Sequence, residues 1–289
     1  MDANKTPSPM SVMWREIRSD KLALVSLFLF LSVVIIAFTW GAYLDSAEVL
    51  RQYLLRGNLP PSREFILGTD HAGRDVFQLL IVGARNSFII AFTIAGLTSI
   101  IGIIVGLTAG YYGGHVDNVI MRLIDFMTMI PTLMFIITMV VLLPSSALNF
   151  GLILTVFGWT GMARSIRMVT LRQGAMDYVK ASKTLGTRNI VIMFREVLPN
   201  ILSFMIVSLT ISLAFTIGIE TGLTFLGFGL PPDMPSLGNS ILNAANPLTM
   251  QLRPWLWLPA ALLVLVMVLC INYIGQAIGR AADARRRRV

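Results

Sequence analysis

Five long runs without a charged residue set the main limit on what this chain can fold into. A helix needs roughly 20 apolar residues to cross about 30 Å of hydrocarbon, and each run reaches that length. In addition, 55% of the residues are hydrophobic and only 13% are charged, which is more apolar surface than a soluble domain can cover. The sequence therefore predicts an integral membrane protein. The runs are residues 22–44, 86–114, 126–163, 197–219 and 254–279.

The third run, residues 126–163, is too long for one crossing. Pro144, Ser145 and Ser146 in its middle are typical of a turn between two helices. Transmembrane β-strands would instead appear as segments of about ten residues with alternating polarity, and none of the runs has that pattern. The prediction is an all-α protein with six transmembrane helices.

The distribution of lysine and arginine predicts the orientation, because basic residues near helix ends are retained on the cytoplasmic side. With the N-terminus inside, 17 of the 23 basic residues fall in cytoplasmic segments. Both termini are therefore expected in the cytoplasm. The predicted order is a cytoplasmic segment 1–21, a first span 22–44, an extracytoplasmic segment 45–85, a five-helix region 86–280 with a cytoplasmic loop 164–196 and an outer loop 220–253, and a basic cytoplasmic tail 281–289.

The net charge of +8 follows from this topology and does not require a nucleic acid partner. The basic tail directly follows a membrane helix, where attraction to anionic lipid is the simpler explanation. The first run has 23 residues, longer than the core of a signal peptide (about 7 to 15), so we expect a retained span. The single cysteine, Cys270, cannot form an intramolecular disulfide and is expected to be a buried apolar side chain.

Candidate catalytic groups are few. The two histidines, His71 and His115, are expected on opposite sides of the membrane and cannot share a site. The sequence has no HExxH, GxSxG or CxxC motif and no GxxxxGK[ST] loop for nucleotide phosphates. We therefore expect no enzymatic activity and no cofactor or metal bound by this chain.

Few acidic residues lie close to the apolar runs. Arg122 and Asp125 are three residues apart, which places them on one helix face and predicts a local ion pair. Glu220 follows the fifth span on the outer side. It is a candidate for the substrate path, and equally for an interfacial residue that contacts water.

Residues 164–196 are too polar to insert into a membrane and carry a helical pattern. Ala175, Tyr178 or Val179, Ser182 and Leu185 recur at helical spacing and predict a short amphipathic helix. Gly186 follows where a helix C-terminus requires positive φ, which predicts a tight turn. An interfacial helix on lipid headgroups fits this pattern equally well.

A second helix is expected after this turn. Thr187 or Asn189 is expected to cap it, and Ile190, Phe194 and Val197 repeat every three to four residues on one face. Pro199 is then expected in the first turn of the fifth span.

Residues 181–186, with Leu198-Pro199-Asn200, resemble the "EAA" loop of membrane subunits of bacterial ATP-binding-cassette importers. Four further segments resemble, in order and spacing, the C-type permease subunits of dipeptide and oligopeptide importers. They cover nearly the whole chain and read "SREFILGTDHAGRDVFQLLIVGARNSF", "AGYYGGHVDNVIMRLIDFMTMIP", "GWTGMARSIRMVTLRQGAMDYVKASKTLG" and "FLGFGLPPDMPSLGNSIL".

The resemblance implies a type I importer permease in a bacterial inner membrane, with residues 177–186 as the coupling helix that docks on a cytoplasmic ATPase. It implies four partners: a homologous B-type permease subunit, two ATPase subunits that bind ATP and Mg, and an extracytoplasmic solute-binding protein. The implied solute is a short peptide, with a nickel chelate or another small solute as alternatives. The implied docking residues are Asp177, Tyr178, Lys180, Ala181, Ser182, Leu185 and Gly186.

Two positions depart from the resembled motif: Lys180 stands where glutamate is expected, and Ser182 replaces a small alanine. A reversed charge changes which partner surface is complementary. Two other classes remain open: an ion-driven secondary transporter, which would normally show repeated halves and charged residues near the midplane, and a scaffold whose cytoplasmic helices recruit a partner without transport.

Overall fold

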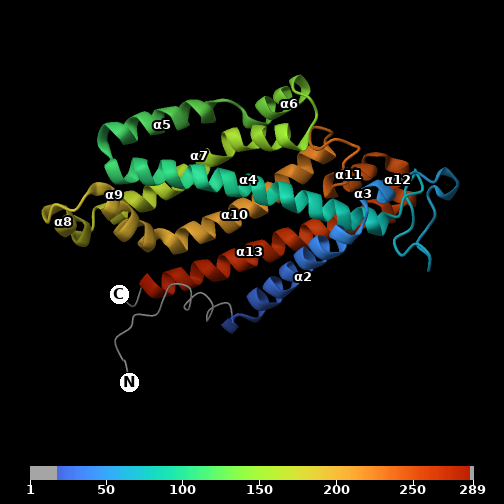
Figure 1. The fold of residues 1–289 in the computed structure, drawn as a ribbon, viewed down its shortest axis with the longest axis horizontal. Coiled ribbons are helices and arrows are strands. Elements are labelled where there is room, and N and C mark those ends of the chain that lie inside the picture. The colour runs from blue at the N-terminus through green and yellow to red at the C-terminus, as the bar shows by residue number, and fades with distance from the viewer. Residues whose placement is uncertain (1–17, 287–289) are drawn as a thin grey trace.

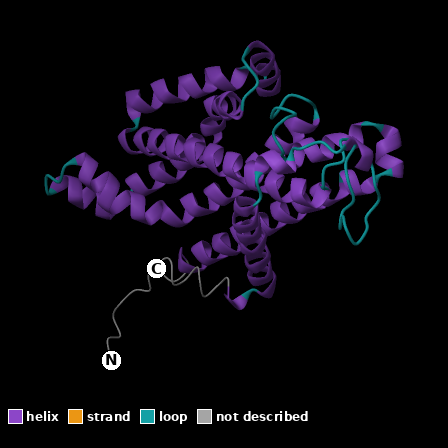
Figure 2. Cartoon of the chain, turned by 45° about the vertical axis from the view of Figure 1, so that its right-hand side comes forward, coloured by secondary structure: helices purple, strands orange, loops and turns teal. Residues whose placement is uncertain are grey.

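The computed structural model describes residues 18–286, with side chains up to Arg280. In this range the chain is helical, apart from loops and one isolated bridge between Thr69 and Asp75 (Figures 1 and 2), so the all-α prediction is confirmed. Predictions for residues 1–17 and for the side chains of the tail lie outside this description. The helices are α2 (Lys21–Tyr43), α3 (Ser46–Val49), α4 (Val76–Tyr112), α5 (Gly114–Met129), α6 (Thr132–Leu142), α7 (Ala147–Gly174), α8 (Asp177–Thr184), α9 (Asn189–Ile192), α10 (Leu198–Phe225), α11 (Leu237–Leu242), α12 (Pro247–Leu252) and α13 (Leu258–Arg286).

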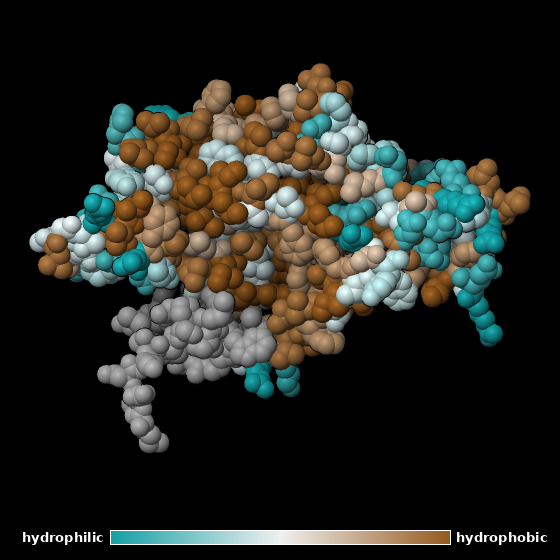
Figure 3. Space-filling model, viewed as in Figure 1, coloured by the Kyte–Doolittle hydropathy of each residue, from teal (hydrophilic) through white to brown (hydrophobic). Residues whose placement is uncertain are grey.

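The predicted count of six spans agrees only approximately with the helices of the structure. In the described part of the chain, four helices are long and apolar enough to cross a membrane: α2, α4, the continuous helix Asn189–Phe225, and α13. α5 and α6 form a fifth span only as a pair, because they are bent by 73° at Ile130 and Pro131. α7 has 28 residues, but arginines in its second half lower its hydropathy. Figure 3 shows apolar side chains over the middle of the molecule and polar ones toward its two ends.

The helix that contains the second predicted span begins at Val76, ten residues before the predicted start of the span at residue 86. Asp75 starts α4, because its side chain accepts a hydrogen bond from the Phe77 amide at 2.8 Å. Arg85 and Asn86 are tolerated inside the helix because each donates to a backbone carbonyl of another element, at 2.9 Å. The helix therefore includes polar residues that composition alone assigned to the outer segment.

Glycines on α4 bring α7 close to it. Gly102, Gly106 and Gly110 are four residues apart, and each faces the backbone or a side chain of α7. A Cβ atom on Gly106 would lie 2.4 Å from the Ala163 carbonyl oxygen, so no larger residue fits at this position without moving a helix. Small residues that allow close backbone approach are the usual basis of helix packing in membranes.

Ion pairs connect α5 to α7. Asp125 accepts from Arg164 at 2.6 Å, so the predicted pair with Arg122 was wrong. Asp117 is buried and pairs with Arg167. The local spacing suggested a partner one turn away on α5, but the antiparallel neighbour α7 brings its own arginines, Arg164 and Arg167, into reach.

The first helix packs on the last one. Ala23 of α2 is buried against Ala277 and Ile278 of α13. Asp20 caps α2 through the amides of Leu22 and Ala23 and also pairs with Arg280. The start of α2 and the end of α13 therefore lie together, as expected if both termini face the same side.

Candidate functional site

Residues 175–200, here called the α8 loop, project from one end of the molecule (Figure 1). Gly186 has φ of 78°, and the predicted turn is confirmed. The Gly186 amide donates to the Lys183 carbonyl at 3.0 Å, and the Thr187 amide donates to the Ser182 carbonyl at 3.1 Å. These two bonds make a Schellman motif, which satisfies carbonyls at the end of α8. The chain therefore reverses at a fixed angle after α8.

The predicted inward face of α8 is only partly right. Val179 is buried and Ser182 is half-buried, but Ala175 and Leu185 are exposed. The helix covers only Asp177–Thr184, so both of these residues lie outside its regular turns. The other predicted docking residues form the exposed side: Asp177, Tyr178, Lys180, Ala181 and Gly186.

Lys180 is paired within its own helix. Its Nζ atom lies 3.0 Å from Asp177 Oδ1, and both side chains are exposed. An exposed pair of this kind contributes little to stability. However, the Asp177 carboxylate balances the positive charge of Lys180, the residue that departs from the resembled motif.

The second helix differs from its prediction at both ends. Arg188 is the N-cap residue, and Asn189 accepts a hydrogen bond from the Tyr111 hydroxyl at 3.0 Å instead of capping the helix. Residues Met193–Val197 then form a π-helical turn that runs without a break into α10. Pro199 follows this turn, and its missing N–H explains why a regular α-helical bond is absent there.

The π-helical turn also changes which residues share a face. Ile190 and Phe194 are exposed, whereas Val197 is buried, so the predicted common face was wrong. One extra residue in the turn rotates everything after it relative to an ideal α-helix. Ile190, Phe194 and Leu185 are therefore three exposed apolar side chains within the α8 loop.

Polar contacts hold α8 against the rest of the chain. Ser182 donates to Glu196 Oε1 at 2.6 Å, and Asn200 donates to the Tyr178 hydroxyl at 3.3 Å. Burial raises the pKa of Tyr178, so its hydroxyl stays protonated and donates to Gln173 Oε1 at 3.1 Å. Sequence reasoning missed Glu196, because nothing in the local pattern indicates a partner 14 residues away.

A cavity of about 540 Å³ lies between α4, α6, α7 and α10. Its walls are mainly apolar, with hydroxyl groups and no charged side chain among the lining residues. A Cβ atom on Gly161 would meet nothing within 4 Å, so this position opens into free space. The hydroxyl groups belong to Thr98, Thr132, Thr160, Ser212 and Thr216.

Glu220 fits neither of its two predicted roles. Its side chain is 0% exposed, so it does not contact water, and it does not line the cavity. Thr221 and Thr224 donate to its two carboxyl oxygens, each at 3.3 Å. It lies beside tightly packed α11, because a Cβ atom on Gly238 would lie 2.5 Å from the Thr224 Cβ atom. Glu220 therefore belongs to a buried polar cluster.

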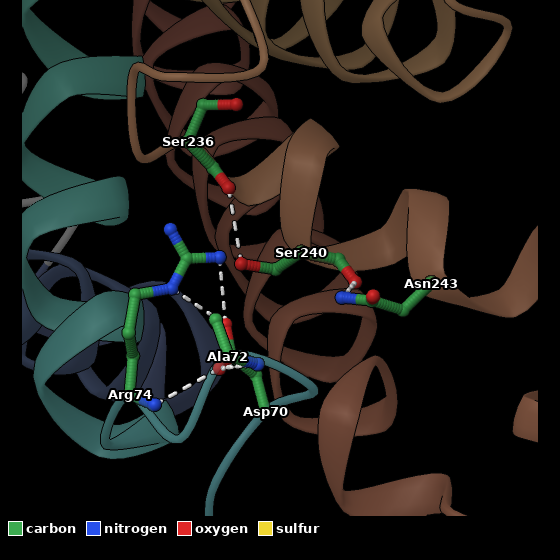
Figure 4. Close-up of polar contacts among 6 residues, drawn as sticks. All are labelled: Asp70, Ala72, Arg74, Ser236, Ser240 and Asn243. Atoms are coloured by element: carbon green, nitrogen blue, oxygen red, sulfur yellow. Dashed lines mark hydrogen bonds and ion pairs between the residues drawn. The ribbon is translucent and has the colours of Figure 1, made fainter. Parts of the chain in front are cut away.

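A smaller pocket of about 250 Å³ lies at the opposite end from α8, between residues 70–79 and α11. Asp70 organises one wall: its carboxylate accepts from the Ala72 and Arg74 amides at 2.9 Å and pairs with the Arg74 guanidinium at 2.7 Å (Figure 4). Ser240 and Asn243 form the other wall.

The two histidines lie near opposite ends of α4, and the cysteine is buried as predicted. His71 lines the pocket before α4, and His115 follows the far end of that helix. α4 has 37 residues, so the two are separated by about 55 Å at 1.5 Å per residue. Cys270 is free and buried. Among the described residues, no group of His, Cys, Asp and Glu could hold a metal ion.

Known proteins are similar to this chain in sequence and in fold. Residues 102–288 match the family of binding-protein-dependent transport system inner membrane components. The chain is 41% identical over 277 residues to the oligopeptide transport system permease protein OppC of Lactococcus lactis subsp. lactis (strain IL1403), covering 94% of this chain and 93% of the relative. It is 36% identical over 276 residues to the dipeptide transport system permease protein DppC of Bacillus subtilis (strain 168), covering 95% and 85%.

A solved structure agrees on the fold. An inward-facing structure of the MetNI methionine ABC transporter superposes with a TM-score of 0.59 at 18% identity, covering 71% of this chain and 96% of that chain. At this identity the likeness concerns the fold alone, which is that of a type I importer permease. Together with the family match and the two relatives, it shows that the chain is a multi-pass membrane protein belonging to the family of binding-protein-dependent transport system inner membrane components.

Proposed function

We propose that this chain forms half of the transmembrane path of an ATP-driven importer for short peptides. The observation that carries the proposal is the α8 loop: an exposed helix, a Schellman turn at Gly186, and one continuous helix from Asn189 to Phe225. A separate motor subunit can move such a helix, because a rigid turn transmits displacement that a flexible linker would absorb. The relatives named as oligopeptide and dipeptide permeases support a peptide as the solute.

The partners follow from this role. Two ATPase subunits hold ATP and Mg, and one of them docks on this chain at Asp177, Tyr178, Lys180, Ala181, Ser182, Leu185 and Gly186. A homologous B-type permease supplies the other half of the path. The chain itself is non-catalytic and binds no cofactor and no nucleic acid. The α8 end and both termini face the cytoplasm of a bacterial inner membrane, with lipid around the apolar helices.

The opposite end receives the solute-binding protein. This end carries two exposed leucines, Leu54 and Leu55. Their segment is bonded to the wall of the pocket, because the Asn58 amide donates to the Asp70 carbonyl at 2.8 Å. An exposed apolar pair beside a polar cleft is typical of a surface that another protein covers.

The cavity of about 540 Å³ is this chain's share of the solute path. Hydroxyl groups without charges can hydrogen-bond to peptide groups and do not select one side-chain charge. This suits an importer whose binding protein makes most of the selection. A nickel chelate or another small solute is the alternative cargo.

Uptake into proteoliposomes tests the proposal. The complex that co-purifies with this chain is reconstituted and supplied with labelled dipeptides to pentapeptides, or with a nickel chelate. We expect peptide uptake that requires ATP and the binding protein. Uptake driven by an ion gradient without ATP would instead support a secondary transporter, and no uptake of any solute would support a scaffold.

Replacing Gly161 with phenylalanine is expected to lower this uptake by about tenfold or more, because Gly161 lines the cavity, its Cβ position is open, and the new ring would fill cavity volume. The same replacement at Gly96, which also opens into free space but does not line the cavity, is the matched control and should leave uptake within about twofold. Equal uptake by both variants would exclude this cavity from the path.

A further inference from the structure

α8 is held against the start of α10 by one buried side chain, Val179, which shares a hydrophobic cluster with Val197 and Ile201, and by two side-chain hydrogen bonds. Among the side chains of α8, all of which are described, only Val179 is buried. Ser182 donates to Glu196 at 2.6 Å, and the Tyr178 hydroxyl accepts from Asn200 at 3.3 Å. Glu196 lies in the π-helical turn and Asn200 in the first turn of α10. Both bonds therefore connect α8 directly to the start of the long membrane helix.

The Ser182–Glu196 bond is the stronger of the two. It is short and has a carboxylate as acceptor, and such bonds are about twice as strong as neutral ones. The other carboxyl oxygen, Glu196 Oε2, is buried and has no donor among the described residues. A buried carboxylate with one donor depends on that donor more than a solvated carboxylate does.

The π-helical turn explains how Glu196 reaches α8. The Leu198 amide bonds to the Met193 carbonyl, five residues back, so one extra residue is accommodated just before Pro199. This extra residue changes the direction of the following side chains. The chain thus places an acid, which an ideal helix would aim elsewhere, against the middle of α8.

We propose that Ser182 and Glu196 are positioning residues whose hydrogen bond carries the displacement of α8 to α10 during ATP-driven import. This inference rests on the proposed function. The covalent route from α8 to α10 passes through the Gly186 turn and two further residues outside any helix. The hydrogen bond bypasses that route and joins the centre of α8 to a segment continuous with α10.

The number of ATP molecules hydrolysed per peptide imported measures this role. In proteoliposomes supplied with labelled dipeptides to pentapeptides, Ser182→Ala is expected to raise that ratio by about fivefold or more. Ser182→Thr keeps a hydroxyl group and Glu196→Gln keeps an acceptor oxygen, so both should stay within about twofold of the wild type. Thr184→Ala is the matched control, because its hydroxyl bonds only to the Lys180 carbonyl of the same helix, at 3.0 Å.

A double variant separates transmission from stability. Ser182→Ala with Glu196→Leu removes both partners, so any instability caused by an unpaired carboxylate at position 196 is absent from this variant. The proposal requires that the ratio stays raised in this variant. A return to the wild-type ratio, or an unchanged ratio in Ser182→Ala, would overturn the inference while leaving the proposed function intact. A wild-type complex that hydrolyses ATP without peptide uptake would overturn both.

Discussion

Replacing Gly186 with valine is expected to lower peptide uptake by more than about tenfold while ATP hydrolysis continues. The residue has φ of 78°, where a side chain costs about 1–2 kcal/mol and a β-branched one costs more. A Cβ atom here would meet nothing within 4 Å, so the cost comes from the backbone alone and not from a clash. The strain is relieved by opening the turn, which loosens the Schellman bonds that tie Gly186 and Thr187 to the end of α8.

The control for this prediction is Gly186→Asn. Asparagine adopts positive φ more readily than other residues with a side chain, so this variant should retain most of the uptake. Both variants are measured for uptake, ATP hydrolysis and membrane insertion. Equal uptake by the valine and asparagine variants would show that the turn geometry does not matter for transport.

Replacing Gly106 with leucine is expected to prevent the chain from folding stably. The new Cβ atom would lie 2.4 Å from the Ala163 carbonyl oxygen and 2.9 Å from the Ile166 Cβ atom. Neither group can move without shifting α7. Overpacking of this kind typically lowers stability by about 1–3 kcal/mol, and sometimes by more. We expect the yield of detergent-purified complex to fall by about tenfold.

Gly96 again provides a matched control on the same helix. Leucine at Gly96 meets open space, so the yield and the thermal midpoint should stay close to the wild type. If Gly106→Leu purified as well as Gly96→Leu, α4 would not pack closely on α7 at Gly106.

The sequence predicted those features that depend on local chemistry. Apolar runs identified the membrane helices, because a helix needs roughly 20 predominantly apolar residues to cross the hydrocarbon. Gly186 identified the turn after α8, because few other residues adopt its backbone conformation. Both predictions needed only the residues concerned.

Features that depend on distant residues could not be predicted in the same way. Asp125 pairs with Arg164 and not with Arg122, and Glu196 pairs with Ser182, because tertiary packing brings separate helices together. Glu220 looked like a path or interface residue, but α4 and α11 enclose it completely. The π-helical turn before Pro199 also changed which residues share a helix face, so regular helical spacing predicted that face incorrectly.

A photo-cross-linker tests most directly whether α8 docks on an ATPase. It is placed at Leu185, which is 85% exposed beside the Gly186 turn, and in a control at Leu55, which is 102% exposed at the other end of the molecule. After illumination of intact cells, we expect the Leu185 position to capture a nucleotide-binding subunit and the Leu55 position not to capture it. Capture of that subunit from Leu55, or its absence from Leu185, would contradict the docking of α8 on an ATPase.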